Sequence, residues 1–441
     1  MHWQQLISAK RYGMEGVPTG HSENRSEFQR DFDRLIFSAP FRRLQNKTQV
    51  FPLPGSVFVH NRLTHSLEVS CVGRSLAGDS AAILLGRHPE LRDTFFPEIA
   101  AIVQAACLAH DLGNPPFGHS GERAISTYFS EGRGRELESR LTAEEWTDFI
   151  RFEGNANAFR LLTHQFDGRR RGGFAMTYST LAAIVKYPFS SSLSGEKGKF
   201  GFFVTEADTF RTIADELHIE CISGSPLHYV RHPLVYLVEA ADDICYEVMD
   251  IEDAHKLKIL TTSETIDLLM AYFDETRSRH LHSTLRMVSD VNEQVAYLRS
   301  SVIGLLVREC TEVFVDHEAD ILAGRFSGSL IEHVSPRVRE AYRRSSERSV
   351  SDIYRSRDVL DVELAGFRVI KTLLELMVDA VQTPDSAYSR LLINRVSSQY
   401  HIHAESLYGR VQAVLDYISG MTDVFALDLY RKINGHSLPA V

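Results

Sequence analysis

Two histidines and two aspartates could together hold a divalent metal ion. His110 and Asp111 form a doublet at the end of an apolar segment, His65 stands at the start of another, and Asp242 lies inside a third. Neighbouring side chains on a helix point about 100° apart, so a doublet can bind one ion only at a helix end or with donors from other segments. Two nitrogen and two oxygen donors suit Mn²⁺, Mg²⁺, Fe²⁺, Ni²⁺ or Zn²⁺. An ion held in this way can polarise a phosphoryl oxygen.

Each of these donors also has a simpler interpretation. A single histidine on a helix is more often a core or surface side chain, and Asp242 with Asp243 could cap a helix or pair with an arginine. A carboxylate inside an apolar helix is nevertheless costly unless it is paired or binds a cation. Composition gives no reason for the string HDLGNPPFGHSGE at 110–122, which favours the metal site.

His119 and Glu122 stand just beyond the doublet and are candidates for acid–base chemistry. They are three residues apart, so on a helical turn they share a face close to the metal donors. The alternative is that Glu122 only caps a helix that opens at Ser120.

Helical periodicity dominates the elements that must position these residues. One helix is expected after Asn61, and a second is expected from Pro97 to a stop at Gly113. Further helices are expected from near Ser120 and at 152–165, 177–186, 232–250, 264–277, 284–317, 359–383, 404–418 and 420–434. Strand signals are limited to Thr48–Phe51 with Val57–Val59, around a Pro54-Gly55 turn, and a weaker one at Phe200–Val204. The predicted fold class is all-α, a helical bundle with a minor β-hairpin near the N-terminus.

Composition and charge narrow the classes of protein further. The chain has 441 residues with 48 Lys and Arg against 58 Asp and Glu, a net charge of −10. This balance argues against a protein that coats nucleic acid or an anionic membrane by bulk charge, although it allows a locally basic pocket. Five dispersed cysteines, no signal peptide and no long apolar run predict a cytoplasmic protein with no membrane partner.

Several sequence blocks, in order along the chain, resemble those of the HD-domain deoxynucleoside triphosphate triphosphohydrolases, the dGTPase-like enzymes. The blocks are FRRL with KTQV at 41–50, RLTHSLEV at 62–69, HDLGNPPFGHSGE at 110–122, FEGNA at 152–156, KYP at 186–188, RHPL with EAADDICY at 231–246, and GMTD at 420–423. Two departures are mild. Asn157 stands where the family suggests Gln, and Val424-Phe425 stands where it suggests Arg-Tyr, so base preference or allostery could differ.

The resemblance implies a fold, a reaction and a set of roles. The fold would be an HD-domain helical bundle that assembles into homo-oligomers such as hexamers. The reaction would be hydrolysis of a dNTP, with dGTP the first guess, to deoxynucleoside and inorganic triphosphate. His119 and Glu122 would be the catalytic pair, with the choice of proton carrier left open. The metal, with Mn²⁺ or Mg²⁺ expected first, would be held by His65, His110, Asp111 and Asp242.

Substrate contacts are expected on both sides of the metal donors. Arg62 and Lys186 suit phosphate oxygens, Arg62 through its forked donors and Lys186 as a point charge. The resemblance places Tyr246 at the phosphates and puts Asp250 and Gln49 at the sugar. Tyr246 has a simpler alternative as a core residue of an amphipathic helix. A tyrosine packed against C2′ would exclude a 2′-hydroxyl, although the sequence does not say which aromatic residue does so.

Two other functions stay open at this point. One is an HD phosphohydrolase acting on other nucleotides, and the other is a DNA-binding regulator that retains an HD shell. The arginine-rich loop at 169–171 could meet substrate phosphates, a neighbouring subunit or single-stranded DNA, and either single-stranded DNA or a dNTP could act as an effector. The expected organisation is an HD-type catalytic core over 1–275 and a helical C-terminal region over 276–441 that packs on it.

Overall fold

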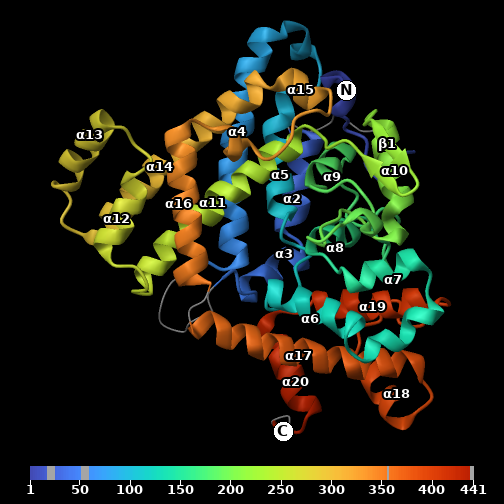
Figure 1. Ribbon diagram of the computed structural model, residues 1–441. Coiled ribbons are helices and arrows are strands. Elements are labelled where there is room, and N and C mark those ends of the chain that lie inside the picture. Colours follow the sequence, from blue (N-terminus) through green and yellow to red (C-terminus); the bar gives the residue numbers. More distant parts are fainter. Residues whose placement is uncertain (17–24, 51–58, 355–356, 438–441) are drawn as a thin grey trace.

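The computed structural model describes residues 1–16, 25–50, 59–354 and 357–437, and these form a helical body with one small sheet (Figure 1). The predicted all-α class is therefore confirmed. Within the described ranges, no helix is long and apolar enough to cross a membrane.

Residues 1–229 supply ten α-helices and the only two strands named among the described residues. The helices are α1 (Trp3–Leu6), α2 (Glu27–Ile36), α3 (Ala39–Arg43), α4 (Arg62–Arg87), α5 (Ile99–Ala109), α6 (His119–Ser130), α7 (Ala143–Ile150), α8 (Gly154–Thr163), α9 (Tyr178–Ile184) and α10 (Ala207–Glu216). The strands β1 (Cys221–Gly224) and β2 (Leu227–Tyr229) pair antiparallel.

The second half supplies the long helix that crosses the site and the helices that surround it. They are α11 (Leu234–Lys256), α12 (Thr262–Met270), α13 (Glu275–Leu285), α14 (Val291–Asp316), α15 (Glu318–Leu322), α16 (Pro336–Arg348), α17 (Arg357–Gln382), α18 (Ala387–Ile393), α19 (Leu407–Ser419) and α20 (Asp423–Ile433).

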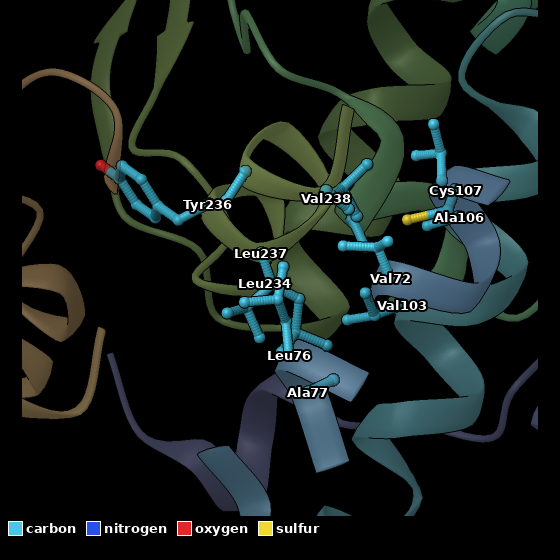
Figure 2. Close-up of a cluster of buried hydrophobic side chains, with 14 of the residues drawn as sticks. Val72, Leu76, Ala77, Val103, Ala106, Cys107, Leu234, Tyr236, Leu237 and Val238 are labelled. Atoms are coloured by element: carbon cyan, nitrogen blue, oxygen red, sulfur yellow. The ribbon is translucent and has the colours of Figure 1, made fainter. Parts of the chain in front are cut away.

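Helices α4, α5 and α11 pack together and form the frame of the site. Figure 2 shows side chains from these helices meeting in one apolar cluster, with Val72 and Leu76 from α4, Val103 from α5, and Leu234 and Leu237 from α11. Burial of apolar surface of this kind is the main favourable contribution to folding. Because the three helices are fixed against one another, the polar residues at their ends and on their inner faces are held in fixed relative positions.

A second apolar core lies beneath the first and joins the N-terminal and C-terminal segments. It combines residues of α6 and α7 with residues of α17 and α19, including a stack of Phe129, Phe149 and Tyr408 rings with centroids 4.8 and 4.9 Å apart. In Figure 1, α17 crosses below α6 and carries this core toward α18 and α20. The C-terminal helices are thus part of the support for the segment that begins at His119.

The strand predictions agree less well with the structure than the helix predictions do. Most of the expected hairpin at 48–59 lies outside the described residues, and Thr48 forms an isolated antiparallel bridge with Asn61. Residues 200–204 do not form a named strand; Phe202 makes one bridge with Ser190. The sheet that the structure does describe, β1 with β2, was not predicted.

Candidate metal centre and catalytic cavity

The four predicted metal donors come together from three separate helices. Ligand atoms of His65, His110 and Asp111 all lie within 4.8 Å of one another. Asp242 Oδ1 lies 3.0 Å from His65 Nε2 and 3.4 Å from His110 Nε2. His65 stands in the first turns of α4, the doublet follows the end of α5, and Asp242 projects from the middle of α11.

The way each helix begins or ends explains this convergence. Asn61 caps α4 through a reciprocal capping box with Thr64, which fixes the start of the helix one turn before His65. His110 is the C-cap residue that follows α5, so the doublet can turn both side chains toward the same point. Asp242 lies on a helix that is buried on most sides, where a carboxylate needs cationic partners.

His110 shows most directly that the cluster fits a cation. Its Nδ1 donates to the carbonyl oxygen of Cys107 at 2.6 Å, which leaves Nε2 facing the carboxylates. That buried Nε2 has no hydrogen-bond partner among the described residues. Burial lowers the pKa of His110, but the charges of Asp111 and Asp242 outweigh it and raise the pKa to about 9. The cluster therefore attracts positive charge, and a divalent ion would satisfy the unpartnered nitrogen.

The carboxylate of Asp111 is shared between the metal cluster and Arg62. Arg62 Nη1 donates to Asp111 Oδ2 at 2.7 Å, and the Asn114 amide donates to Oδ1. Burial would raise the pKa of Asp111, but the Arg62 and His110 charges hold it below its usual value. The predicted phosphate contact Arg62 is thus already paired, and it also orients one of the donors.

His119 and Glu122 form the pair that their spacing predicted. His119 Nδ1 lies 3.0 Å from Glu122 Oε2, while Glu122 Oε1 accepts from the backbone N–H of Gly154 at 2.9 Å. Burial would raise the pKa of Glu122, but the hydrogen bond and charge of His119 and the Lys199 charge hold it below its usual value. The amide that Glu122 binds belongs to α8, so the carboxylate does not cap the helix that carries it.

A glycine is required where α8 meets this pair. A Cβ at Gly154 would lie 2.0 Å from the Asn114 amide oxygen and 2.7 Å from Glu122 Oε1. Contacts this short are not tolerated, so any larger residue would push Glu122 or Asn114 out of place. This close approach explains why a glycine stands at position 154, within the FEGNA block.

The remaining predicted substrate residues lie along α11 and next to it. Lys186 Nζ pairs with Glu239 Oε1 at 3.1 Å, and the Tyr246 ring lies 6.4 Å from the His65 ring. Asp250 accepts a hydrogen bond from the Tyr354 hydroxyl, and burial raises the pKa of Asp250 to about 7. Gln49 has a buried amide oxygen with no partner among the described residues.

One cavity of about 200 Å³ collects most of the predicted residues. We call it the catalytic cavity. The predicted residues on its wall are Gln49, Arg62, His110, Asp111, His119, Glu122, Lys186, Asp242 and Tyr246. His65 and Asp250 are not part of that wall. His65 contacts it through Asp242, and Asp250 holds Tyr354, whose ring lies 6.2 Å from the ring of the wall residue Tyr246.

The cavity wall also includes residues that sequence reasoning missed. Lys199 lines it and pairs with Glu153 at 2.6 Å, although it comes from a Ser/Gly/Lys-rich loop with no periodicity to mark it. Glu239 binds both Lys186 and Arg231, at 3.1 and 3.0 Å. Glu239 lies within the EAADDICY block, so its position there was the only signal available for it.

The KTQV and GMTD blocks, which carried no predicted role beyond Gln49, meet behind the catalytic cavity. Lys47 Nζ donates to the carbonyl oxygens of Asn114 and Ser419. Asp423 accepts from the backbone N–H of Thr48 at 2.8 Å and from that of Phe117 at 2.9 Å. Burial lowers the pKa of Lys47 to about 7. The C-terminal helices thus hold the segment between the metal doublet and His119.

That segment contains a strained turn directly before His119. Phe117 has φ of 62° and Gly118 has φ of 57°, in the left-handed region that only glycine adopts without strain. A Cβ at Gly118 would also lie 2.8 Å from the Arg62 guanidinium. A non-glycine residue such as Phe117 persists in this conformation only when surrounding contacts hold it, and Asp423 supplies one of those contacts.

Replacing Asp423 with alanine should therefore lower kcat on the order of 10²-fold, because small displacements of a catalytic group have effects of that size. The variant should keep its metal content, since Asp423 touches none of the four donors. Asp423→Asn retains one acceptor oxygen, so its kcat should lie between those of the wild type and Asp423→Ala. Asp428→Ala on the same helix removes only a surface pair with Lys432 and is the control. Steady-state kinetics with metal analysis measure the effect, and an unchanged kcat would contradict it.

The departures from the family pattern occupy different positions. Asn157 is buried, and its amide donates to the Gly113 carbonyl oxygen at 2.6 Å, so it supports the doublet segment. Val424 and Phe425 are exposed, Val424 by 62%. Arg169 and Arg170 line a surface pocket with Arg34 and do not line the catalytic cavity.

Comparison with known proteins agrees with the geometry. Residues 62–187 match the family model for the HD domain, and residues 333–432 match the model for the phosphohydrolase-associated domain. The chain is 38% identical over 453 residues to a deoxyguanosinetriphosphate triphosphohydrolase-like protein of Synechocystis, covering 99% of this chain and all of that protein. It is 37% identical to one of Pseudomonas aeruginosa, with both chains fully covered. It is 30% identical to a deoxyguanosinetriphosphate triphosphohydrolase of Yersinia enterocolitica, with 98% of each covered.

Proposed function

We infer, from the premise that this chain belongs to the deoxyguanosinetriphosphate triphosphohydrolase-like family of HD-domain proteins, that it is a dNTP triphosphohydrolase. The reaction is hydrolysis of a dNTP to deoxynucleoside and inorganic triphosphate. dGTP is the first substrate to test because the relatives are named for it. The observation that carries the proposal is the cluster of His65, His110 and Asp111, joined by Asp242, beside the pair of His119 and Glu122.

We propose that His65, His110, Asp111 and Asp242 hold the divalent ion. Mn²⁺ and Mg²⁺ are the first candidates, and Ni²⁺, Fe²⁺ and Zn²⁺ also suit two nitrogen and two oxygen donors. When bound, the ion supplies Lewis-acid stabilisation of negative charge on a phosphoryl oxygen. The Cys107 carbonyl keeps the His110 proton on Nδ1 and Arg62 orients Asp111, so two of the donors are arranged before the ion binds.

His119 and Glu122 are proposed to act on the reacting groups. Glu122 accepts the Nδ1 proton of His119, which leaves the other ring nitrogen to face the α-phosphate in the cavity. His119 is 70% exposed in its side chain, so it can reach a substrate, whereas Glu122 is buried and fixed by Gly154. Water attacks the α-phosphorus, and His119 assists the proton transfer or stabilises the charge that develops.

The substrate is proposed to lie along α11. Lys186, Lys199 and Arg62 contact the phosphates, since all three line the cavity and carry donors for anionic oxygens. Gln49 and Asp250 bind the sugar. Tyr246 contacts the phosphates, and Tyr354, whose ring lies 6.2 Å from that of Tyr246, is the aromatic residue proposed to exclude a 2′-hydroxyl.

The finer aspects of the assembly are also proposals. The chain is expected to work in the cytoplasm as a homo-oligomer, with a hexamer as the size that the family resemblance implies. Exposed apolar residues such as Leu364, Leu391 and Val424 support association. The division into 1–275 and 276–441, and regulation by dNTPs or single-stranded DNA, stay predictions. Light scattering coupled to gel filtration measures the oligomer directly.

Product analysis tests the reaction. The protein is incubated with each of the four dNTPs and with their mixtures, in Mn²⁺ or Mg²⁺, and the phosphate products are separated by ion chromatography. Release of inorganic triphosphate is expected. Release of orthophosphate alone would instead indicate an HD phosphohydrolase of another type, and DNA affinity with a steep salt dependence but no turnover would indicate a regulator. Activity on mixtures but not on single dNTPs would indicate activation by a dNTP.

A further inference from the structure

A second cavity adjoins the catalytic cavity and is much larger. We call it the tail chamber; its volume is about 1000 Å³, and it shares Tyr187, Lys199 and Glu239 with the catalytic cavity. The catalytic cavity, at about 200 Å³, is smaller than the ~300–1000 Å³ usual for ligand sites. Part of a bound nucleotide must therefore lie outside the catalytic cavity, and the tail chamber continues that cavity.

The order of residues on α11 shows which end of a substrate faces the tail chamber. Asp242, one of the four proposed metal donors, lies between Glu239 and Asp250 on this helix. Glu239 and Asp250 are eleven residues apart, which corresponds to about 16 Å along the axis. Glu239 forms an ion pair with Lys186 and lines the tail chamber, whereas Asp250 is the proposed sugar contact. The phosphate chain therefore points toward the tail chamber and the nucleoside points away from it.

The charges on the two walls differ in sign. The catalytic cavity has an acidic excess before a metal ion is counted: its basic residues are Arg62, Lys186 and Lys199, and its acidic residues are Asp111, Glu122, Glu153, Glu239 and Asp242. The tail chamber has a basic excess: its basic residues are Lys197, Lys199, Arg231, Arg339 and Arg343, and its acidic residues are Glu239, Asp243, Glu332 and Glu347. A polyanion is therefore favoured in the tail chamber more than in the catalytic cavity alone.

Two of the basic residues of the tail chamber form no ion pair with a carboxylate in the part of the chain that the structure describes. Arg339, on α16, donates to the carbonyl oxygen of Glu332 at 3.2 Å and forms no ion pair among the described residues. Lys197 is exposed and likewise forms no ion pair within the described ranges. The hydroxyls of Ser329 and Ser346 add donors to the same wall. Free cations and hydroxyl donors on one concave wall match the oxygens of a phosphate chain.

We propose that the tail chamber binds the distal end of a phosphate chain, so that the enzyme accepts deoxynucleoside 5′-tetraphosphates as well as 5′-triphosphates. The hydrolytic part of this inference rests on the proposed function. Water forms the new oxygen bond to the α-phosphorus, and the bond from that phosphorus to the 5′-oxygen breaks. The electron pair stays on the 5′-oxygen, which takes up a proton, and the products are deoxynucleoside and inorganic tetraphosphate.

Binding of inorganic tetraphosphate to the full-length protein tests the tail chamber without turnover. Calorimetry compares the wild type with Arg339→Glu, Lys197→Glu and the control Arg344→Glu. Arg344 is exposed on α16 but is not part of the chamber wall. In each of the first two variants the dissociation constant for tetraphosphate should rise about tenfold, as expected for a lost charge-assisted contact. The control should stay within about twofold. Equal binding by all four proteins, or equal weakening in the control, would overturn the proposal.

Hydrolysis of deoxyguanosine 5′-tetraphosphate is the second measurement. The wild type should release inorganic tetraphosphate, and Arg339→Glu should lower kcat/KM for the tetraphosphate about tenfold more than kcat/KM for dGTP. Hydrolysis of dGTP without hydrolysis of the tetraphosphate would overturn the inference and leave the proposed function standing. Charge-sensitive binding of tetraphosphate without turnover of either nucleotide would support the tail chamber and contradict the proposed function.

Discussion

Replacing His65 with alanine is expected to abolish dNTP hydrolysis and to remove the bound metal while the fold survives. His65 Nε2 lies 3.0 Å from Asp242 Oδ1, and together they join α4 to α11 at the metal centre. Lewis-acid stabilisation by a bound ion contributes several kcal/mol, so its loss corresponds to at least about 10³-fold in kcat/KM. Elemental analysis of the protein after loading with Mn²⁺ measures the metal, and thermal denaturation followed by circular dichroism checks the fold.

A histidine at the other end of the same helix provides the matched control. His88 ends α4 and pairs with Glu318, far along the helix from the cluster. His88→Ala should retain the metal and stay within about twofold of wild-type activity, as expected for a partly exposed surface pair. Chelation of the wild type should reproduce the loss in His65→Ala, and added Mn²⁺ should restore the wild type only. A variant at His65 that stays active and loaded with metal would refute the site.

Asp111 calls for a different substitution because of its second partner. Alanine there would leave the Arg62 guanidinium buried without its carboxylate, which costs about 3–5 kcal/mol of stability. Asp111→Asn keeps an oxygen for Arg62 and removes the charge that the metal requires. We therefore expect Asp111→Asn to fold and to lose both metal and activity. Asp111→Ala is a poorer test, because its inactivity could result either from loss of the metal or from unfolding.

The parts of the site that could be predicted are those in which local spacing decides the outcome. His119 and Glu122 are three residues apart and meet on one helix, as the spacing requires. Asn61 before an apolar run predicted the start of α4, and the structure shows its capping box. Convergence of the four donors was suggested by family resemblance and by the need of a buried carboxylate for a partner, because no local pattern relates residues 65, 110 and 242.

The parts that could not be predicted depend on pairing between distant segments. Helical periodicity does not predict that Arg62 pairs with Asp111 or that Lys186 pairs with Glu239. These ion pairs nevertheless determine how available each cation is to bind a phosphate. Asp423 is 306 residues from Phe117, and neither residue has a pattern that points to the other. Contacts of this kind arise only when the apolar cores have fixed the helices.

Two of the predicted helices are interrupted in the structure, because aspartate N-caps start new helices at positions that helical periodicity does not reveal. The segment expected at 264–277 ends as α12 at Met270, and Asp274 then caps a new helix, α13. The segment expected from 284 begins as α14 only at Val291, after the cap Asp290. An Asp side chain that accepts from a backbone N–H three residues on starts a helix even where apolar residues on both sides keep helical spacing.

Glu122→Gln is expected to lower kcat by about 10²–10⁴-fold while the metal stays bound, which is the usual size of a general acid–base contribution. Glu122 Oε2 accepts the Nδ1 proton of His119, and Oε1 accepts from Gly154. Glutamine keeps the shape and one acceptor oxygen, so Gly154 can remain bonded. The amide nitrogen then faces His119 Nδ1 and favours the opposite tautomer. Steady-state measurement of kcat, together with metal content and melting temperature, tests this expectation.

The comparison between Glu122→Gln and Glu122→Ala separates catalysis from support. If Glu122 serves only to hold the start of α8, glutamine should preserve kcat and alanine should lower both stability and rate. If the carboxylate orients His119, both substitutions should lower kcat by similar factors. Glu131→Gln at the exposed end of α6 is the control for the change of charge, and it should leave kcat unchanged.

A double variant decides whether His119 and Glu122 act as one unit. When two residues serve a single step, removing both costs about as much as removing either. We therefore expect His119→Ala with Glu122→Gln to be no slower than the slower single variant. Multiplied losses would mean that the two side chains act on separate steps. In that case Glu122 would affect turnover through Gly154 and α8, and His119 would act without it.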